Sequence, residues 1–193
     1  MIEVELKSVV DDLDARRAAV VEAGGVLEFA GRLEDRRYDS ADGSLSARDH
    51  VLRLRRYRST EADRAMLEWK GPTRREEGYK VREEIGASLD DGDAIRLMLD
   101  RLGYRVVTAI DREIAQYALH GATVRFERYP RLDDLVEVEG APEAIERAIV
   151  ALGLPRAGFS TDRLSDFVAR YEARSGGRAA ICDADLTRPH DHG

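Results

Sequence analysis

Charged and aliphatic residues alternate from the second residue of the chain. Residues 2–7 have the sequence Ile-Glu-Val-Glu-Leu-Lys. Because successive side chains of an extended strand point to opposite faces, the charged side chains would share one face and the aliphatic ones the other. The same alternation returns in five later segments, at 52–55, 67–70, 80–85, 124–127 and 135–139. This recurrence predicts a set of strands that each carry charge on one face.

The sequence divides into eight predicted strands and four predicted helices. Strands are expected at 2–9, 26–38, 50–58, 64–71, 79–87, 105–119, 122–129 and 134–140. Helices are expected at 11–23, 90–102, 142–153 and from 160 or 161 to about 173. Aspartates in the first helix turns, glycines after the helix ends and proline at position 142 are typical of such boundaries.

These elements predict an α+β fold in which an eight-stranded, mainly antiparallel β-barrel is flanked by helices. If the aliphatic faces point outward onto the helices, the charged side chains fill the lumen. A lipocalin-like barrel for an apolar ligand is disfavoured, because its lumen would be apolar. The length favours one domain over residues 1–174. The Ser-Gly-Gly sequence after Arg174 predicts a flexible C-terminal tail over residues 175–193.

The composition narrows the function. Of the 193 residues, 36% are charged, against about a quarter in an average protein, and the formal net charge is −7. An acidic chain is a poor general binder of nucleic acid, which needs a basic face. The single cysteine, Cys182, excludes an internal disulfide and a zinc site built on several thiolates. Since no apolar run approaches about 18 residues, no membrane partner is expected, and we predict a cytoplasmic protein.

The charged residues follow one another in an ordered series of motifs. Glu3-x-Glu5-x-Lys7 is followed by Asp35, Tyr38 and Asp39, by Arg53-x-Arg55, by Lys70-Gly71-Pro72, by Arg82-x-Glu84, by Arg112 and Tyr117, by Arg125, and by Glu137-x-Glu139. This series resembles the CYTH family of triphosphate tunnel metalloenzymes, which includes class IV adenylyl cyclases, thiamine triphosphatases and inorganic triphosphatases. The resemblance covers residues 2 to about 170.

Two positions depart from the family pattern. Many cyclase-like members have a second basic residue two positions after the first, where this chain has Ile114 after Arg112. They also carry an aspartate ten residues before the acidic pair, where this chain has Glu127. The first departure would remove one positive charge from the phosphate-binding site. The second keeps a carboxylate but on a side chain that is longer by one methylene group.

The resemblance implies the roles of the lumen residues. A triphosphate-binding set would comprise Lys7, Arg53, Arg55, Lys70, Arg82, Arg112 and Arg125, because several cations must meet a polyanion in a tunnel. Ligands for Mg²⁺ or Mn²⁺ would be Glu3, Glu5, Glu127, Glu137 and Glu139. Glu5 and Lys7 are the candidate catalytic residues. If other cations surround Lys7, its pKa would fall and it could orient or deprotonate water; otherwise it contacts phosphate.

Three functions remain open at this point. The first is a class IV adenylyl cyclase-like enzyme that converts ATP to cyclic AMP and pyrophosphate, favoured slightly because helices follow the strand at 134–140. The second is a triphosphatase that hydrolyses the terminal phosphate of tripolyphosphate, thiamine triphosphate or a nucleotide. The third is a non-catalytic triphosphate-binding protein, suggested by Ile114. In each case the partner is a small triphosphate, and a homodimer is possible.

Overall fold

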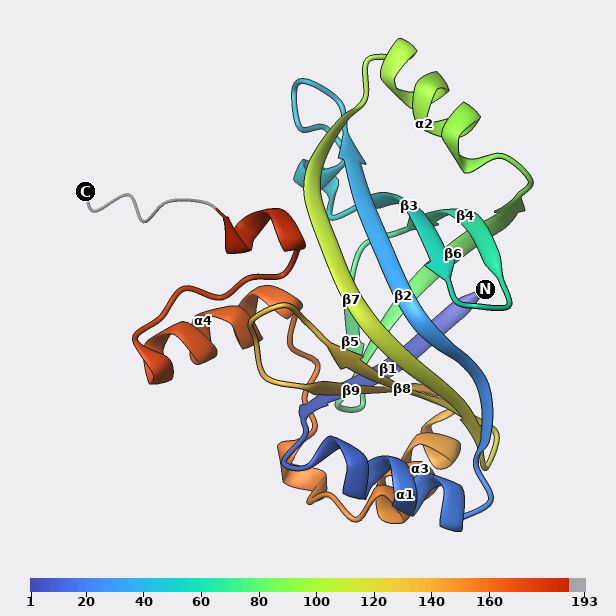
Figure 1. Ribbon diagram of the computed structural model, residues 1–193, viewed down its shortest axis with the longest axis vertical. Coiled ribbons are helices and arrows are strands. Elements are labelled where there is room, and N and C mark those ends of the chain that lie inside the picture. The colour runs from blue at the N-terminus through green and yellow to red at the C-terminus, as the bar shows by residue number, and fades with distance from the viewer. Residues whose placement is uncertain (188–193) are drawn as a thin grey trace.

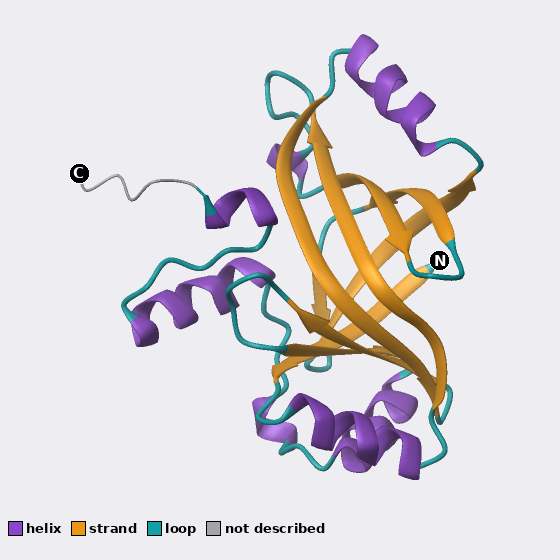
Figure 2. Ribbon diagram, in the orientation of Figure 1, coloured by secondary structure: helices purple, strands orange, loops and turns teal. Residues whose placement is uncertain are grey.

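The computed structural model describes residues 1–187, and their strands form a closed barrel (Figures 1 and 2). The strands of this part of the chain are β1 Ile2–Val9, β2 Val26–Asp39, β3 Val51–Arg58, β4 Asp63–Lys70, β5 Arg74–Glu76, β6 Tyr79–Leu89, β7 Arg105–Leu119, β8 Ala122–Arg128 and β9 Leu135–Gly140. They form one sheet in the order β1-β9-β8-β7-β2-β3-β4-β6-β5, and the antiparallel pairing of β1 with β6 closes it. The predicted fold class is therefore confirmed.

The short strand β5 was not predicted. It pairs only with β6, outside the closed ring, so that eight of the described strands make the barrel. The longest pairing joins β2 to β7, whose hairpin partner β8 follows at His120 and Gly121. Both turn residues have positive φ, 52° and 83°, as a tight hairpin requires. These long strands form the wall that curves around the lumen (Figure 2).

The described helices lie outside the barrel. They are α1 Leu13–Glu22, α2 Gly92–Arg101, α3 Pro142–Leu152 and α4 Leu164–Ser175, with short 3₁₀ turns η1 Ser46–Arg48, η2 Arg156–Gly158 and η3 Asp183–Leu186. The carboxylate of Asp12 caps α1 by accepting from the Ala15 amide at 3.0 Å. Helices α1 and α3 cover one side together, whereas α2 lies at the far end of β2 and β7 (Figure 1). In the described part of the chain, no helix has the length and hydropathy needed to cross a bilayer.

The main apolar core lies between the barrel wall and the helix pair α1 and α3. Leu6, Val136 and Val138 point outward from β1 and β9 and are fully buried against Ile145 and Ile149 of α3. Burial of this aliphatic face is the main driving force for closing the barrel. The residues between them on each strand are thereby directed into the lumen, as the alternation predicts.

A second apolar cluster lies inside the barrel. Leu33, Tyr57 and Ile114 pack together with Phe29 and Met66. They occupy the same strand faces as the charged lumen residues, because each is an even number of positions from one of them on the same strand. The aliphatic side chain at position 114 therefore belongs to a local apolar layer of the lumen, and a basic side chain there would be buried without a partner.

The C-terminal segment is partly packed against the barrel. Ala180 pairs with Arg131, and the carbonyl of Ile181 accepts from the Asp111 amide at 2.8 Å. Cys182 is buried beside them. Tertiary hydrogen bonds thus hold part of the segment for which the composition predicts a flexible tail, and the flexibility of residues 175–187 stays a prediction. Residues 188–193 lie outside the described part of the chain.

Candidate active site

The lumen brings together the charged residues that the sequence singled out. Of the residues predicted to bind phosphate or metal, those at most 7% exposed are Glu3, Glu5, Arg53, Arg55, Lys70, Arg82, Arg112, Arg125, Glu127 and Glu137. Lys7 and Glu139 are partly exposed and lie in the same lumen. Because charged side chains are rarely buried unless paired, this concentration indicates a site.

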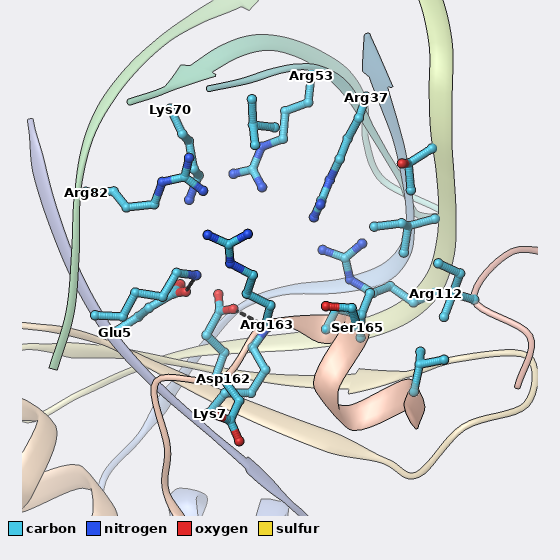
Figure 3. Close-up of a pocket in the computed structure, with 18 of the residues that line it drawn as sticks. Glu5, Lys7, Arg37, Arg53, Lys70, Arg82, Arg112, Asp162, Arg163 and Ser165 are labelled. Carbon is cyan, nitrogen blue, oxygen red and sulfur yellow. Dashed lines mark hydrogen bonds and ion pairs between the residues drawn. The ribbon is translucent and has the colours of Figure 1, made fainter. Parts of the chain in front are cut away.

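A cavity of about 450 Å³ occupies the lumen (Figure 3). Among the described residues, ten basic side chains line it: Lys7, Arg37, Arg53, Arg55, Lys70, Lys80, Arg82, Arg112, Arg125 and Arg163. The acidic residues on its walls are Glu5, Asp49, Glu137 and Asp162. The volume suits a small ligand, and the excess of basic side chains favours an anion.

Three carboxylates cluster beside this cavity. One oxygen each from Glu3, Glu84 and Glu139 lie within 4.8 Å of one another. Burial raises the pKa of Glu84 and of Glu139, and the charge of Glu3 raises both further. Lys70 contacts Glu3 and lies 3.5 Å from Glu84, which offsets part of the repulsion. Such an oxygen-only cluster could hold a divalent metal ion, and it includes Glu84, which was not among the predicted metal ligands.

Glu5 lies next to this cluster and is held ionised by lysines. Burial alone would raise its pKa, but Lys80, Lys7 and Lys70 together lower it well below the usual range. Lys80 contacts the Glu5 carboxylate directly. A carboxylate kept charged in this way is available as a ligand or as a hydrogen-bond acceptor for water. The predicted catalytic role of Glu5 stays a prediction.

Glu127 and Glu137 are engaged by cations. Lys7 Nζ lies 2.5 Å from Glu137 Oε2 and 3.5 Å from Glu127 Oε2. Arg112 Nε donates to Glu127 Oε1 at 3.0 Å, and Arg125 contacts both glutamates. Lys7 therefore lies between two carboxylates, and its predicted role, either in orienting or deprotonating water or as a phosphate contact, stays a prediction. Metal ligation by Glu127 and Glu137 stays a prediction.

Arg53 and Arg55 are fixed by acidic partners behind them. Arg53 Nε donates to Glu68 Oε2 at 2.9 Å, and Arg55 Nε donates to Asp35 Oδ2 at 3.4 Å. Burial alone would raise the pKa of Glu68, but Arg55 and Arg53 lower it to about 2. Asp35, which is fully buried, is likewise kept ionised by Arg53 and Arg55 against the effect of burial on its pKa. The guanidinium planes are thus oriented before any ligand binds.

The Asp35, Tyr38 and Asp39 motif divides into a lumen residue and structural residues. Only Asp35 joins the charged network. Asp39 instead orders the following loop, since its carboxylate accepts from the amides of Leu45 and Ser46, both at 2.9 Å. The Tyr38 ring packs in an apolar cluster under α2. This motif therefore contains one residue of the charged lumen, Asp35, and two residues, Tyr38 and Asp39, that stabilise the neighbouring structure.

Helix α4 covers one end of the cavity, which we call the mouth and which is lined by Asp49, Asp162, Arg163 and Ser165. Arg163, which lies at this end of the cavity in Figure 3, has its Nη2 3.1 Å from Asp49 Oδ1, so that α4 is tied to the loop after η1. Backbone hydrogen bonds of 2.9 Å in both directions between Lys7 and Ser160 hold the segment that leads into α4. The C-terminal part of the chain thereby completes the site.

Sequence reasoning missed several lumen residues. Lys80 and Glu68 lie in the alternating segments 80–85 and 67–70, so strand parity could have found them. Arg37 follows Asp35 at the same parity and could have been found in that way. No local sequence pattern identifies Arg163 as a lumen residue, because it extends into the cavity from the start of a helix and not from an alternating strand.

Comparison with known proteins gives one family. The CYTH domain matches residues 1–150. The PH1819 protein of Pyrococcus horikoshii OT3 has a similar structure, with a TM-score of 0.72 and 26% identity over 87% of this chain and 98% of that one. Among the curated proteins, no match was found.

Two more distant solved structures share the fold. A Vibrio parahaemolyticus protein assigned without confirmation as an adenylate cyclase gives a TM-score of 0.74 at 18% identity, covering 88% of this chain and 98% of its own. HpAC1 of Hippeastrum, an adenylyl cyclase candidate described as having a dominant triphosphatase activity, gives 0.59 at 18% identity, covering 91% and 95%.

Proposed function

The chain belongs to the CYTH domain family, and from this premise we propose that it is a metal-dependent enzyme that hydrolyses a triphosphate. One observation carries the proposal: a lumen cavity with a large excess of cations adjoins three clustered carboxylates. The two parts are in contact, because Arg53 and Lys70 line the cavity and also reach Glu84. A phosphate chain among the cations would therefore end beside the carboxylates.

Glu3, Glu84 and Glu139 are the residues that would hold Mg²⁺ or Mn²⁺. Burial, and then the charge of Glu3, raises the pKa of Glu84 and of Glu139, and a bound divalent cation would relieve both effects. When bound, such a cation neutralises phosphoryl oxygens and lowers the pKa of water. Glu5, ionised and next to this cluster, is the side chain best placed to orient that water.

The arginines would position the phosphate chain. A triphosphate carries about four negative charges near neutral pH, and each guanidinium fork can take two phosphoryl oxygens. Arg53, Arg55, Arg112 and Arg125 are buried and already oriented by carboxylates behind them. Preoriented donors of this kind stabilise developing charge without reorganising, which is how phosphoryl transfer is accelerated.

Hydrolysis is favoured over cyclisation by the lining of the cavity. Tyr129 is its only aromatic residue among the described side chains, and its hydroxyl donates to Glu127 Oε2 at 2.6 Å. It is thus held as part of the charged network, and the Arg112 guanidinium lies over its ring at 5.8 Å from the centroid, where a purine would have to compete with it. The groups in the cavity recognise phosphoryl oxygens rather than a nucleoside.

Cyclisation of ATP is the second candidate, since one wall at the mouth is apolar. Ile110, Leu164, Val168 and Ile181 line the cavity there. A ribose and base could lie against this wall with the phosphates among the arginines. The 3′-hydroxyl would then have to reach the α-phosphorus.

The test is incubation of the protein with tripolyphosphate, ATP and thiamine triphosphate, each with Mg²⁺ or Mn²⁺. Orthophosphate release supports the proposal, whereas cyclic AMP with pyrophosphate supports the second candidate. Tight binding without product would show a non-catalytic triphosphate-binding protein. We expect Glu139→Gln to lower metal-dependent turnover at least ~100-fold while tripolyphosphate still binds in EDTA. Glu143→Gln, on the exposed face of α3, is the matched control and should retain activity.

A further inference from the structure

Arg37 differs from its neighbours in the cavity in having no acceptor. It lies on β2, and its side chain extends into the cavity from the side that also carries Arg53 and Arg112 (Figure 3). The hydrogen bonds and ion pairs of residues 1–187 include none to its guanidinium, and its Nε is buried without a partner. A buried charged donor without an acceptor is costly, so this position indicates a missing anion.

The surroundings of Arg37 strengthen this point. Burial lowers the pKa of Arg37, and the nearby charges of Arg53, Arg112 and Arg55 lower it further, against the opposing effect of Asp35. Asp35 Oδ2 is engaged by Arg55 and lies 3.7 Å from Arg53, and Asp35 Oδ1 is buried without a hydrogen bond to Arg37 or to any other described residue. Arg112 also has a donor, Nη1, that is buried and unpaired. Unfilled donors from two arginines thus face one region of the cavity.

This region lies across the cavity from Glu5, the neighbour of the Glu3, Glu84 and Glu139 cluster. In Figure 3, Arg37 and Arg112 stand on one side of the cavity, and Glu5 stands on the other with Lys70 and Arg82 above it. A phosphate chain with one end beside the carboxylates would therefore direct its other end towards Arg37. For an organic triphosphate, that other end is the esterified phosphate and its organic group. For tripolyphosphate, it is a second free terminal phosphate.

We propose that Arg37 is a specificity-determining residue that binds the outer phosphate of a free polyphosphate chain and so favours inorganic tripolyphosphate over organic triphosphates. This inference rests on the proposed function. A free terminal phosphate carries about −1.5 to −2 charges near neutral pH and offers three acceptor oxygens, whereas an esterified phosphate has one charge fewer. The unpaired donors of Arg37 and Arg112 match the free form.

Thiamine triphosphate is disfavoured for a second reason. Its thiazolium ring is a cation, and it would lie beside the guanidinium of Arg37 with Arg53 and Arg112 nearby. Like charges in a cavity of low dielectric repel strongly. ATP, whose adenosine is neutral, should fall between the two.

The experiment compares Arg37→Gln with the wild type in steady-state kinetics on tripolyphosphate, ATP and thiamine triphosphate. We expect KM for tripolyphosphate to rise about 10- to 100-fold with kcat changed less than ~3-fold, because a charge-assisted contact of ground and transition state is lost. The preference for tripolyphosphate over thiamine triphosphate should fall at least ~10-fold. Arg37→Lys should raise KM less than Arg37→Gln does. The matched control is Arg96→Gln, which replaces an exposed arginine of α2.

The same variants are titrated with tripolyphosphate in EDTA by calorimetry. Weaker binding by Arg37→Gln alone would support the inference even if the wild type turned over none of the substrates, a result that would defeat only the proposed function. The inference is overturned if Arg37→Gln binds tripolyphosphate as the wild type does. Equal losses on all three substrates, with an unchanged preference, would also overturn it.

Discussion

Glu68 shows how single side chains keep the charged lumen stable. It lies behind the arginines, accepts from Arg53 and lies 3.2 Å from Arg55 Nε. The desolvation of three charges is offset only because each has a close partner. Such a carboxylate prepares the arginines for a phosphate chain and also contributes to folding. Removing it would leave two guanidiniums buried with one acidic neighbour fewer.

Acid unfolding should reveal this contribution. The pKa of Glu68 is lowered from 4.5 to about 2 on folding, so its ionised form stabilises the fold above pH ~4.5 and this contribution is lost as the pH falls towards 2. We expect Glu68→Gln to lower the free energy of unfolding by about 3 kcal/mol at pH 6, and by less than half as much at pH 3. Urea denaturation of both proteins at the two pH values measures this. An equal loss in the free energy of unfolding at pH 6 and at pH 3 would contradict this role of Glu68.

Strand parity predicted which side chains share the lumen, but not which of them pair. Glu3, Arg55 and Glu137 could be placed together because each lies on the charged face of an alternating strand. Their ion-pair partners depend on which strands are neighbours, and that order is set by the fold. Glu84 was not predicted as a metal ligand for this reason, since only barrel closure places it beside Glu3. Parity could have placed Arg37 in the lumen, but its lack of an acceptor depends on the fold.

Helix α4 illustrates how an element can be predicted while its role is not. The helix was expected to begin at residue 160 or 161, but Ser160 pairs with Lys7 as an isolated bridge. The helix therefore begins at Leu164, and Arg163 precedes it at the mouth. Strand β5 was not predicted because its three residues, Arg74–Glu76, are too few to show an alternating pattern. Boundaries that depend on tertiary hydrogen bonds are beyond local sequence patterns.

Arg163 should matter for binding and little for folding. Its ion pair with Asp49 is about half exposed, and such pairs contribute little to stability. We expect Arg163→Gln to shift Tm by less than ~2 °C while KM for tripolyphosphate rises about 3- to 10-fold, because one cation at the mouth is lost. Arg174→Gln, at the exposed end of α4, is the control. A large loss of Tm with unchanged KM would assign Arg163 a purely structural role.

Across the entire chain, the barrel depends on β1, which pairs with β6 on one side and β9 on the other. The same strand supplies Glu3, Glu5 and Lys7 to the lumen and Leu6 to the outer core. The alternation predicted this arrangement and hence the fold class. It could not predict that part of the lumen is apolar, because Leu33 and Ile114 are not distinguished locally from residues of the outer core.

Ligands of the lumen should therefore stabilise the fold as a unit, since they contact strands all around the barrel. At a concentration of 100 times Kd, tripolyphosphate should add about 2.7 kcal/mol and raise Tm by about 5–10 °C. Mg²⁺ or Mn²⁺ alone should give a smaller rise that Glu139→Gln abolishes. Thermal denaturation with and without each ligand measures both effects. An unchanged Tm at saturating tripolyphosphate would argue against a lumen site.

The outward position of the main core has an evolutionary consequence. The residues that drive folding lie on the outer face of the strands, and the residues that would bind a ligand lie on the inner face of the same strands. Exchanging matched acid–base pairs inside the barrel therefore need not disturb the aliphatic contacts with α1 and α3. Related chains could acquire new substrates by altering alternate positions only. A library that varies lumen pairs jointly, with the outer positions held constant, should therefore yield many folded barrels with altered anion preference.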